Sequence, residues 1–396
     1  MSAPSTLRAM TPFTAILAAS ASVFPAFLTG ALGVQLKADL GISDVRFGFS
    51  ISVFFGAAAL SSVVLGRLGE RLGATRAMTS GLAITLLVQL TVAGSVRTYP
   101  ALLAALFVGG AANALTQTSA NLFLARSVPV SQMGFALALK QSGMPSATLL
   151  GGLAVPVLAE TVGWEWAYAT GAALAVAALI AIAAHGPTPD RPSIERRPRQ
   201  PTARPDLNTS TLLVLATGVG CAAFGASAIT TFLVSSAERA GMSPGRAGLL
   251  LSLGSVLGIV SRITLGLRAD RVTTAMLPKV AALLAGGALG LVMLIPQNPG
   301  WHVAAVPLAF GAGWAWPALF NAAVVLANPS APAAATGVTQ TGVYVGAVAS
   351  PIILGALIDG PGYGAAWATA AAALLFGALV IAIGSTAAGD RPVVAS

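Results

Sequence analysis

The sequence predicts an all-α membrane protein with twelve transmembrane helices in two pseudo-symmetric six-helix bundles. Of the 396 residues, 56% are hydrophobic and only 8% are charged, so one water-soluble globule could not bury the apolar surface. The apolar residues fall into twelve runs, each close to the roughly 20 residues that a helix needs to cross a bilayer. Polar motifs in the first six runs recur in the last six. Together these observations place the chain in lipid as a duplicated bundle.

The twelve runs are separated by short polar breaks and by one longer segment between the sixth and the seventh. That segment, residues 186–209, is rich in Pro and Arg, which favours an extended, solvated linker. The predicted organisation is therefore an N-terminal bundle (1–185), a cytoplasmic linker (186–209) and a C-terminal bundle (210–396). The expected spans are 10–36, 47–67, 76–95, 99–124, 131–159, 165–184, 210–236, 244–268, 276–296, 301–326, 333–358 and 362–385.

The distribution of Lys and Arg predicts the orientation in the membrane. If the N-terminus is inside, fourteen of the 21 basic residues fall in inside segments, as the positive-inside rule requires. We therefore expect a multi-pass protein of the cell inner (cytoplasmic) membrane with both termini cytoplasmic. The net charge of +9 is explained by this topology, because the basic residues form no patch on a polar domain. No nucleic acid partner is expected.

The duplication of the two bundles is visible at three places with a nearly constant offset. Asn, Gln and Gly are informative here because they are not the filler residues of Ala-rich spans. The matched pairs are Gly66-Arg67-Leu68-Gly69-Glu70-Arg71 with Gly266-Leu267-Arg268-Ala269-Asp270-Arg271, Asn121 with Asn321, and Gln141-Ser142-Gly143 with Gln340-Thr341-Gly342.

The segment between spans two and three carries a motif. Residues 66–76 read Gly-Arg-Leu-Gly-Glu-Arg-Leu-Gly-Ala-Thr-Arg. In this motif the chain resembles the major facilitator superfamily, whose members have twelve spans, two six-helix halves and a loop of the form Gly-x-Leu-Ala-Asp-Arg-x-Gly-Arg-Lys at this place. Glu70 stands where the family has Asp, while Ala74 and Thr75 depart from the pattern.

The resemblance implies transport by alternating access and an inner latch formed by acidic and basic side chains at the ends of spans two and eight. A carboxylate and arginines can pair there in one conformation and separate in the other. The alternative is that the arginines only set the topology. The latch residues that the resemblance implies are Gly66, Glu70, Arg71, Arg76, Asp270 and Arg271.

Lys140 is the most informative residue inside a span. It lies about nine residues into the fifth span, on the order of 13 Å past the cytoplasmic boundary. A cation at such depth is costly and usually faces a cavity. Lys140 is followed by Gln141, and Gly143 and Pro145 allow the helix to bend at this depth. We expect Lys140 and Gln141 to contact substrate, with a structural partner for the ammonium as the alternative.

Other polar and aromatic side chains inside spans complete the candidate binding site. Asn113, Gln117 and Asn121 recur every four residues and share one helix face; they could line a cavity or hold helices together. Arg262 is either a second anion contact or a snorkelling side chain. The remaining candidates for substrate contact are Trp314, Trp316, Asn321, Gln340 and Tyr344.

The acidic residues limit the substrate class. None of the twelve falls at the middle of a span, whereas proton-driven pumps commonly use such a carboxylate. A cavity that holds cationic side chains and no carboxylate argues against cationic drugs as substrates. Uniport, anion exchange and symport of a proton with an anion all stay open.

The prediction is a secondary active transporter of a small organic solute, with an organic anion favoured, acting as a monomer in the lipid bilayer. The alternative is an efflux carrier for multiple drugs or metabolites that are neutral or amphipathic; a channel or a membrane receptor is less favoured. The sequence contains no nucleophile–base set or phosphate loop, so an enzyme is not expected. His185, His302 and Cys221 show no ligand spacing, so no metal and no cofactor are expected.

Overall fold

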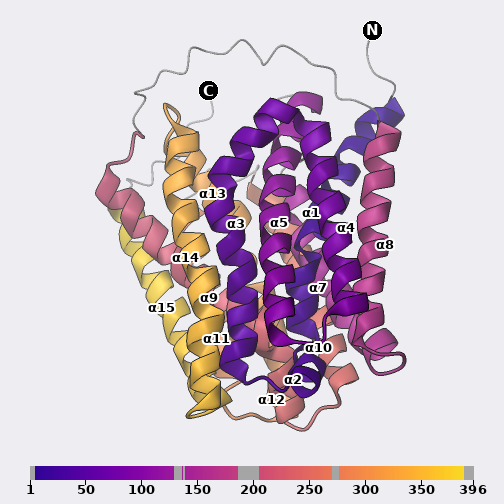
Figure 1. Cartoon of the computed structure of the whole chain (residues 1–396). Helices are drawn as coiled ribbons and strands as arrows, with labels where there is room; N and C mark the ends of the chain where they lie inside the picture. Colours follow the sequence, from indigo (N-terminus) through magenta and orange to yellow (C-terminus); the bar gives the residue numbers. More distant parts are fainter. Residues whose placement is uncertain (1–4, 129–135, 137–138, 186–204, 270–275, 388–396) are drawn as a thin grey trace. The chain divides into compact units, whose positions relative to one another are not determined.

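The computed structural model describes residues 5–128, 136, 139–185, 205–269 and 276–387, and nearly all of them are helical (Figure 1). The chain divides into two compact units. The first unit comprises Met1–Ile42 and Val53–Arg199, and the second comprises Ser43–Ser52 and Gln200–Ser396. Most of the predicted linker, residues 186–204, lies outside the described residues.

The described N-terminal part of the chain is a series of helices. They are α1 (Ser5–Ala31), α2 (Gly33–Leu40), α3 (Asp44–Leu72), α4 (Ala74–Ser95), α5 (Tyr99–Ser127), α7 (Gly143–Ala154), the π-helix η2 (Val155–Ala159) and α8 (Trp164–His185).

The helices of the C-terminal part have a similar order. They are α9 (Thr209–Arg239), α10 (Pro244–Ala269), α11 (Met276–Val292), α12 (Pro299–Gly311), α13 (Pro317–Leu326), α14 (Pro332–Asp359) and α15 (Tyr363–Ala387).

The predicted twelve-span, all-α membrane fold is confirmed. Among the described residues, ten helices are long and apolar enough to cross a membrane, and α11 and α13 are shorter apolar helices. The tenth span differs from the expectation of one continuous helix, because it is split into α12 and α13 by residues 312–316. Gly311 and Gly313 lower helix propensity, and Pro317 can only begin a new helix, so the chain breaks between them.

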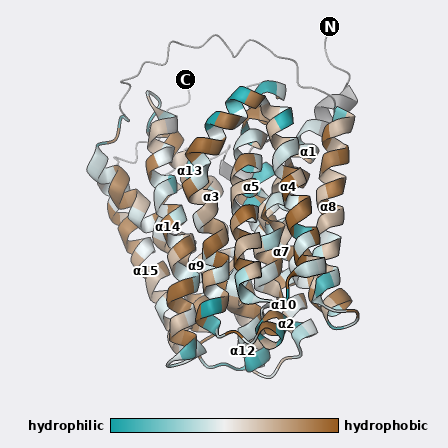
Figure 2. Ribbon diagram, in the orientation of Figure 1, coloured by the Kyte–Doolittle hydropathy of each residue, from teal (hydrophilic) through white to brown (hydrophobic). Residues whose placement is uncertain are grey.

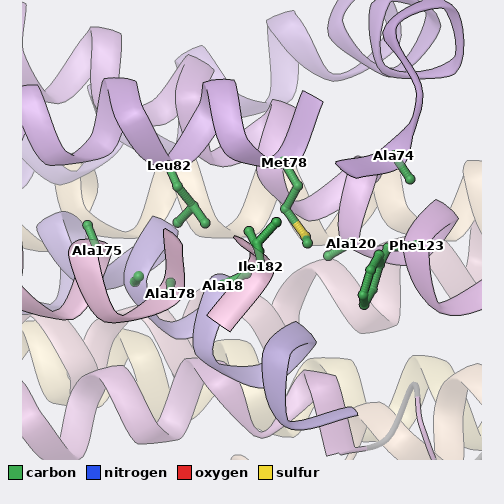
Figure 3. Packing of buried hydrophobic residues seen from close by; sticks show 10 residues of the cluster. Ala18, Ala74, Met78, Leu82, Ala120, Phe123, Ala175, Ala178 and Ile182 are labelled. Carbon is green, nitrogen blue, oxygen red and sulfur yellow. The ribbon is translucent and has the colours of Figure 1, made fainter. Parts of the chain in front are cut away.

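Small side chains form the core of the first unit (Figure 3). Alanines of α1, α5 and α8 leave room for the larger side chains Met78, Leu82, Phe123 and Ile182, all of which are at most 2% exposed. Van der Waals packing of small residues is the main force between helices in lipid, where no hydrophobic effect draws them together. This close packing positions α1 against α4, α5 and α8.

Glycines bring α9 and α14 into contact in the second unit. A Cβ on Gly342 would lie 2.0 Å from the carbonyl oxygen of Ala216, and one on Gly346 would lie 2.0 Å from that of Gly220. Both helices thus present small residues four positions apart, which is the spacing of close helix pairs in membranes. No larger side chain fits at this crossing.

The outer faces of the helices are apolar. Leu375, Phe376, Leu379 and Ile383 on α15 are each at least half exposed, and Figure 2 shows mostly hydrophobic residues along this helix and along α8. Such an exposed apolar stripe would be unstable in water and suits contact with lipid tails.

The first residues of α3 belong to the second unit because they are held by α14. The Asp359 carboxylate accepts hydrogen bonds from the backbone N–H groups of Asp44 (2.8 Å) and Val45 (3.0 Å). A carboxylate at this position satisfies N–H groups that a helix N-terminus leaves without intrahelical partners. The Ser52 hydroxyl also donates to the Val348 carbonyl at 2.7 Å.

The end of the linker is held by the turn between α13 and α14. The Asp206 carboxylate accepts hydrogen bonds from the backbone N–H of Ser330 (2.9 Å) and from its hydroxyl (2.8 Å). These bonds favour the ionised form and lower the pKa of Asp206. The backbone N–H of Leu207 donates to the Asn328 side chain at 3.0 Å, so the chain enters α9 from a defined position.

We predict that Gly346→Ala destabilises the protein by about 1–3 kcal/mol, since the new methyl group meets a backbone carbonyl and forces α9 and α14 apart. The measurement is the thermal unfolding midpoint of the purified protein in detergent. Gly337→Ala on the same helix is the control, because nothing lies within 4 Å of the place that its new methyl group would take. Equal midpoints for the two variants would contradict the packing argument.

Candidate functional site

Lys140 is a buried cation in the first unit. Its side chain is 5% exposed, and its Nζ lies 3.5 Å from the carbonyl oxygen of Gln117 on α5. Among the described residues, this carbonyl is the one acceptor that the ammonium group reaches. An ammonium carries three N–H donors, so within the described residues two of them have no acceptor.

The position of Lys140 follows from a close approach of α7 to α1. The helix is interrupted by a turn at Ser142, and α7 begins at Gly143. A Cβ on Gly143 would lie 3.0 Å from the Cβ of Ala19 and 3.1 Å from the backbone nitrogen of Ser20. The absence of a side chain at Gly143 therefore lets this segment press against α1 and brings Lys140 beside α5.

Two of the three predicted amides on α5 lie against α1. Asn113 is 7% exposed, and its Oδ1 accepts a hydrogen bond from the Ser22 hydroxyl at 3.1 Å. The Gln117 Nε2 donates to the carbonyl of Ala19 at 3.3 Å. Ser22 was not predicted, because a single Ser in an Ala-rich span gives no signal of its partner. The amides hold α1 to α5 beside the ammonium of Lys140.

Arg262 in the second unit joins α10 to the break in the tenth span. Its side chain is 9% exposed, and its Nε donates to the backbone carbonyl of Trp314 at 2.9 Å. Its guanidinium carbon lies 4.8 Å from the centre of the Trp314 ring, which is cation–π distance. A carbonyl next to a helix break needs a new donor, and Arg262 supplies it.

Trp316 is the second aromatic residue in the break. It is 5% exposed and packs edge-to-face on Phe320 with ring centres 6.1 Å apart. Within the described part of the chain, its buried indole N–H has no acceptor. Buried indole N–H groups are normally hydrogen-bonded, so the Trp316 donor departs from the usual pattern within the described residues.

The structure therefore brings Lys140, Asn113 and Gln117 together in the first unit and pairs Arg262 with Trp314 in the second. The other candidates are not part of these two groups. Asn121, Gln141 and Gln340 are exposed, and Asn321 and Tyr344 are half-buried. Their contact with substrate stays a prediction.

The family model of the Major Facilitator Superfamily matches residues 13–351 of this chain. The chain belongs to the Major Facilitator Superfamily. Its members are transporters, so the chain is a multi-pass membrane protein of a transporter family.

Relatives and solved structures agree with this assignment. Uncharacterized MFS-type transporters of Mycobacterium tuberculosis strains CDC 1551 and H37Rv are 26% and 25% identical over 270 residues, which are 66% of this chain. The match spans 60% of the length of each relative.

Two solved structures share the fold. A bacterial homolog of the human lysosomal transporter Spinster, in an inward-facing and occupied conformation, superposes with a TM-score of 0.72 at 15% identity over 98% of this chain and 97% of that one. A mutant of the peptide transporter POT superposes with a TM-score of 0.76 at 14% identity, over 96% and 95% respectively.

The superfamily motif lies at the turn between α3 and α4. Gly73 has a φ of +85°, a conformation that L side chains rarely adopt, so the glycine of the motif is required by the turn. Glu70, Arg71 and Arg76 are exposed around it. Gly66 lies farther back on α3, where an added Cβ would meet only Thr118 at 3.9 Å. Asp270 and Arg271, the proposed partners at span eight, lie outside the described residues.

We predict that Arg262→Ala lowers stability by about 1–3 kcal/mol, because it leaves the Trp314 carbonyl without its donor and removes the stacked guanidinium. Arg262→Lys should recover only part of this loss, since an ammonium does not stack as a planar group. The measurement is thermal unfolding followed by tryptophan fluorescence. Arg246→Ala, at the exposed start of the same helix, is the control; an equal effect of both alanine variants would refute the role of Arg262.

Proposed function

We propose that this transporter is secondary active and moves a small organic anion by alternating access of its two six-helix halves. The observation that carries the proposal is Lys140, a cation that is 5% exposed and has one acceptor, 3.5 Å away, among the described residues. Inserting a cation at membrane depth costs about 2.5–3.5 kcal/mol. A carboxylate ligand would offset this cost with charge-assisted hydrogen bonds.

The acidic residues support an anion rather than a cation. Every described Asp and Glu lies at the end of a helix or in a connecting segment: Asp39, Asp44, Glu70, Glu160, Glu165, Asp206, Glu238 and Asp359. In the described part of the chain, no carboxylate is therefore placed at mid-span to neutralise Lys140 or to bind a cationic substrate.

We assign the other binding roles from local geometry. Gln117 and Asn113 orient the ammonium by fixing α5 on α1, and Gln117 offers its carbonyl to Lys140 itself. In the second half, the indole N–H of Trp316 is a neutral donor for the substrate, and Arg262 fixes the broken segment that carries it. Proposed contacts of lesser definition are Asn121, Gln141, Asn321, Gln340 and Tyr344.

The remaining proposals concern location and conformational control. We place the protein in the inner membrane as a monomer with both termini cytoplasmic, divided into residues 1–185, a linker of 186–209 and residues 210–396. Gly66, Glu70, Arg71 and Arg76 would form one side of the inner latch. Asp270 and Arg271 would form the other side.

A second candidate function is efflux of neutral or amphipathic compounds. The aromatic pairs Phe310–Trp314 and Trp316–Phe320, with ring centres 5.6 Å and 6.1 Å apart, flank the break in the tenth span. Aromatic surfaces bind apolar ligands without requiring charge, which favours this alternative over a channel or a receptor.

The substrate class can be tested by a thermal-shift screen of the purified protein against organic acids, amino acids, neutral aromatic compounds and cationic drugs. A ligand that binds the folded state raises the unfolding midpoint. We expect organic acids to do so. Stabilisation by neutral or cationic compounds alone would favour the alternative function and contradict the proposed one.

Lys140→Ala should reduce uptake of the identified acid into proteoliposomes by about 10-fold to 100-fold, the effect of losing one charge-assisted hydrogen bond. Lys279→Ala, which removes an exposed lysine on α11, is the matched control. Wild-type uptake should saturate and accelerate when the same acid is present inside, as a carrier requires. Unchanged kinetics in Lys140→Ala would remove the anion assignment, and loss of both saturation and acceleration would indicate a channel.

A further inference from the structure

A hydrogen-bonded cluster lies at one end of the second unit, where α9 ends and α12 and α15 begin. We call it the far-end cluster and define it as Ser236, Gln297, His302 and Trp367. His302 and Ser236 are completely buried, and Trp367 is 1% exposed. The transport mechanism proposed above makes no use of these residues.

Ser236 is the centre of the cluster. Its Oγ accepts a hydrogen bond from the Trp367 indole N–H at 2.8 Å, lies 2.9 Å from the Nε2 of His302, and lies 3.3 Å from the Oε1 of Gln297. The other ring nitrogen of His302, Nδ1, is 2.9 Å from the backbone carbonyl of Asn298. Both ring nitrogens thus have an oxygen at hydrogen-bond distance.

The contacts determine most of the hydrogen positions. A carbonyl only accepts, so the Nδ1 of His302 carries a hydrogen and donates it to Asn298. The Gln297 Nε2 donates to the Leu294 carbonyl at 2.7 Å, which leaves the Oε1 of Gln297 facing Ser236 as an acceptor. The Ser236 hydroxyl can therefore donate its hydrogen either to the Nε2 of His302 or to the Oε1 of Gln297.

The cluster accommodates both protonation states of His302. With a neutral ring, the Ser236 hydroxyl donates to Nε2, and Gln297 Oε1 receives no hydrogen bond from Ser236. With a protonated ring, Nε2–H donates to Ser236, and the hydroxyl turns to donate to Gln297. In this second state every contact within the cluster is a hydrogen bond. The His302 ring can therefore accept a proton when the Ser236 hydroxyl rotates, and every N–H and O–H group of the cluster then still has an acceptor.

His185 shows what a histidine without this arrangement looks like. Its Nε2 lies 2.9 Å from the hydroxyl of Thr11, but its buried Nδ1 has no partner among the described residues. A hydrogen on that nitrogen would have no acceptor within the described part of the chain, whereas both nitrogens of the His302 ring face an oxygen.

The fold itself does not require a polar residue at this position. His302 lies 200 positions after Leu102, the offset of the internal repeat, and Leu102 is fully buried. Gln297 is also the one described residue other than glycine with a positive φ, +51°. Such a conformation is unfavourable for a long side chain and persists where the surroundings enforce it. Both observations favour a functional reason for the cluster.

The charged groups at this end of the second unit do not contact the ring nitrogens of His302 among the described residues. At the same end, α9 carries Glu238 and Arg239, α10 carries Arg246 and α15 carries Tyr363. The end of α11 that lies here has no titratable residue, since Lys279 is near the opposite end of that helix. The Tyr363 hydroxyl donates to Asp44 at 3.3 Å. The nitrogens of the His302 ring, by contrast, face Ser236 and the Asn298 carbonyl.

We propose that His302 is a proton-binding site, in which Ser236 relays the change of charge to Gln297 and so makes the hydrogen bonding between α9, α12 and α15 depend on pH. The proton goes to Nε2, and the Asn298 carbonyl and the Ser236 oxygen stabilise the imidazolium. In the transporter proposed above, this site lets the pH on that side of the membrane act on the second half.

The site can be tested without a substrate by NMR of the full chain with ring-¹⁵N histidine in lipid nanodiscs. The variant His185→Asn leaves His302 as the one labelled ring. We expect its nitrogen shifts to change from neutral to protonated as the pH is lowered, and the Trp367 indole N–H signal to follow the same curve. Constant shifts from about pH 4.5 to pH 8.5 would overturn the proposal.

Two variants separate a proton relay from simple packing. Ser236→Ala, made in the His185→Asn background, should move the midpoint to lower pH by about one unit, because the imidazolium loses one acceptor. An unmoved midpoint would refute the relay. His302→Gln should flatten the pH dependence of uptake over the same range. If His302→Gln keeps the wild-type pH profile of uptake although the ring of His302 titrates in the NMR experiment, the regulatory part of the proposal fails. If neither the wild type nor any variant takes up the acid, the result counts against the proposed transport function instead.

Discussion

The structure depends on one constraint: the interior of a membrane provides no hydrogen-bond partners, so the chain must satisfy its own polar groups. Most hydroxyls in the spans do this locally, as when Thr85 and Thr116 donate to carbonyls four residues earlier on the same helix. The break in the tenth span is satisfied by Arg262. Among the described residues, the ammonium of Lys140 and the indole N–H of Trp316 keep donors without an acceptor, and the proposed binding site is built on these two groups.

Glycine determines how close the helices come, and this closeness positions the polar side chains. Gly143 allows α7 to press on α1, and that contact places Lys140 beside Gln117. At the crossing of α9 and α14, backbone oxygens lie where a Cβ on Gly342 or Gly346 would be. In the first unit, the missing side chain at Gly143 thus sets where the ammonium of Lys140 lies, and in the second unit the glycines set how closely α9 and α14 pack.

Much of the fold could be predicted because hydropathy and length are local properties. The runs of apolar residues indicated the twelve spans. The break in the tenth span was not predicted, although Pro317 and the glycines before it stand where the helix ends. The candidate site was predicted less well. The four-residue spacing placed Asn113 and Gln117 on one face, but nothing in the sequence pointed to Ser22 or to the carbonyl of Ala19 as their partners. The far-end cluster joins residues between 236 and 367, which share no motif.

The sequence by itself determined that this protein spans a membrane with twelve helices, that it belongs to the Major Facilitator Superfamily, and that a lysine lies deep within the fifth span. The spans and the depth of the lysine follow from the composition and the order of residues along the chain, and the family membership follows from the match to the family model. Only the tertiary structure decided which partner each buried polar group has. Lys140 contacts the carbonyl of Gln117, and Arg262 contacts the carbonyl of Trp314 at the helix break. His302 contacts the Ser236 hydroxyl and the Asn298 carbonyl. The physical reason is that hydrogen bonds reach only about 3 Å, so their partners are set by how the helices pack and not by their spacing in sequence.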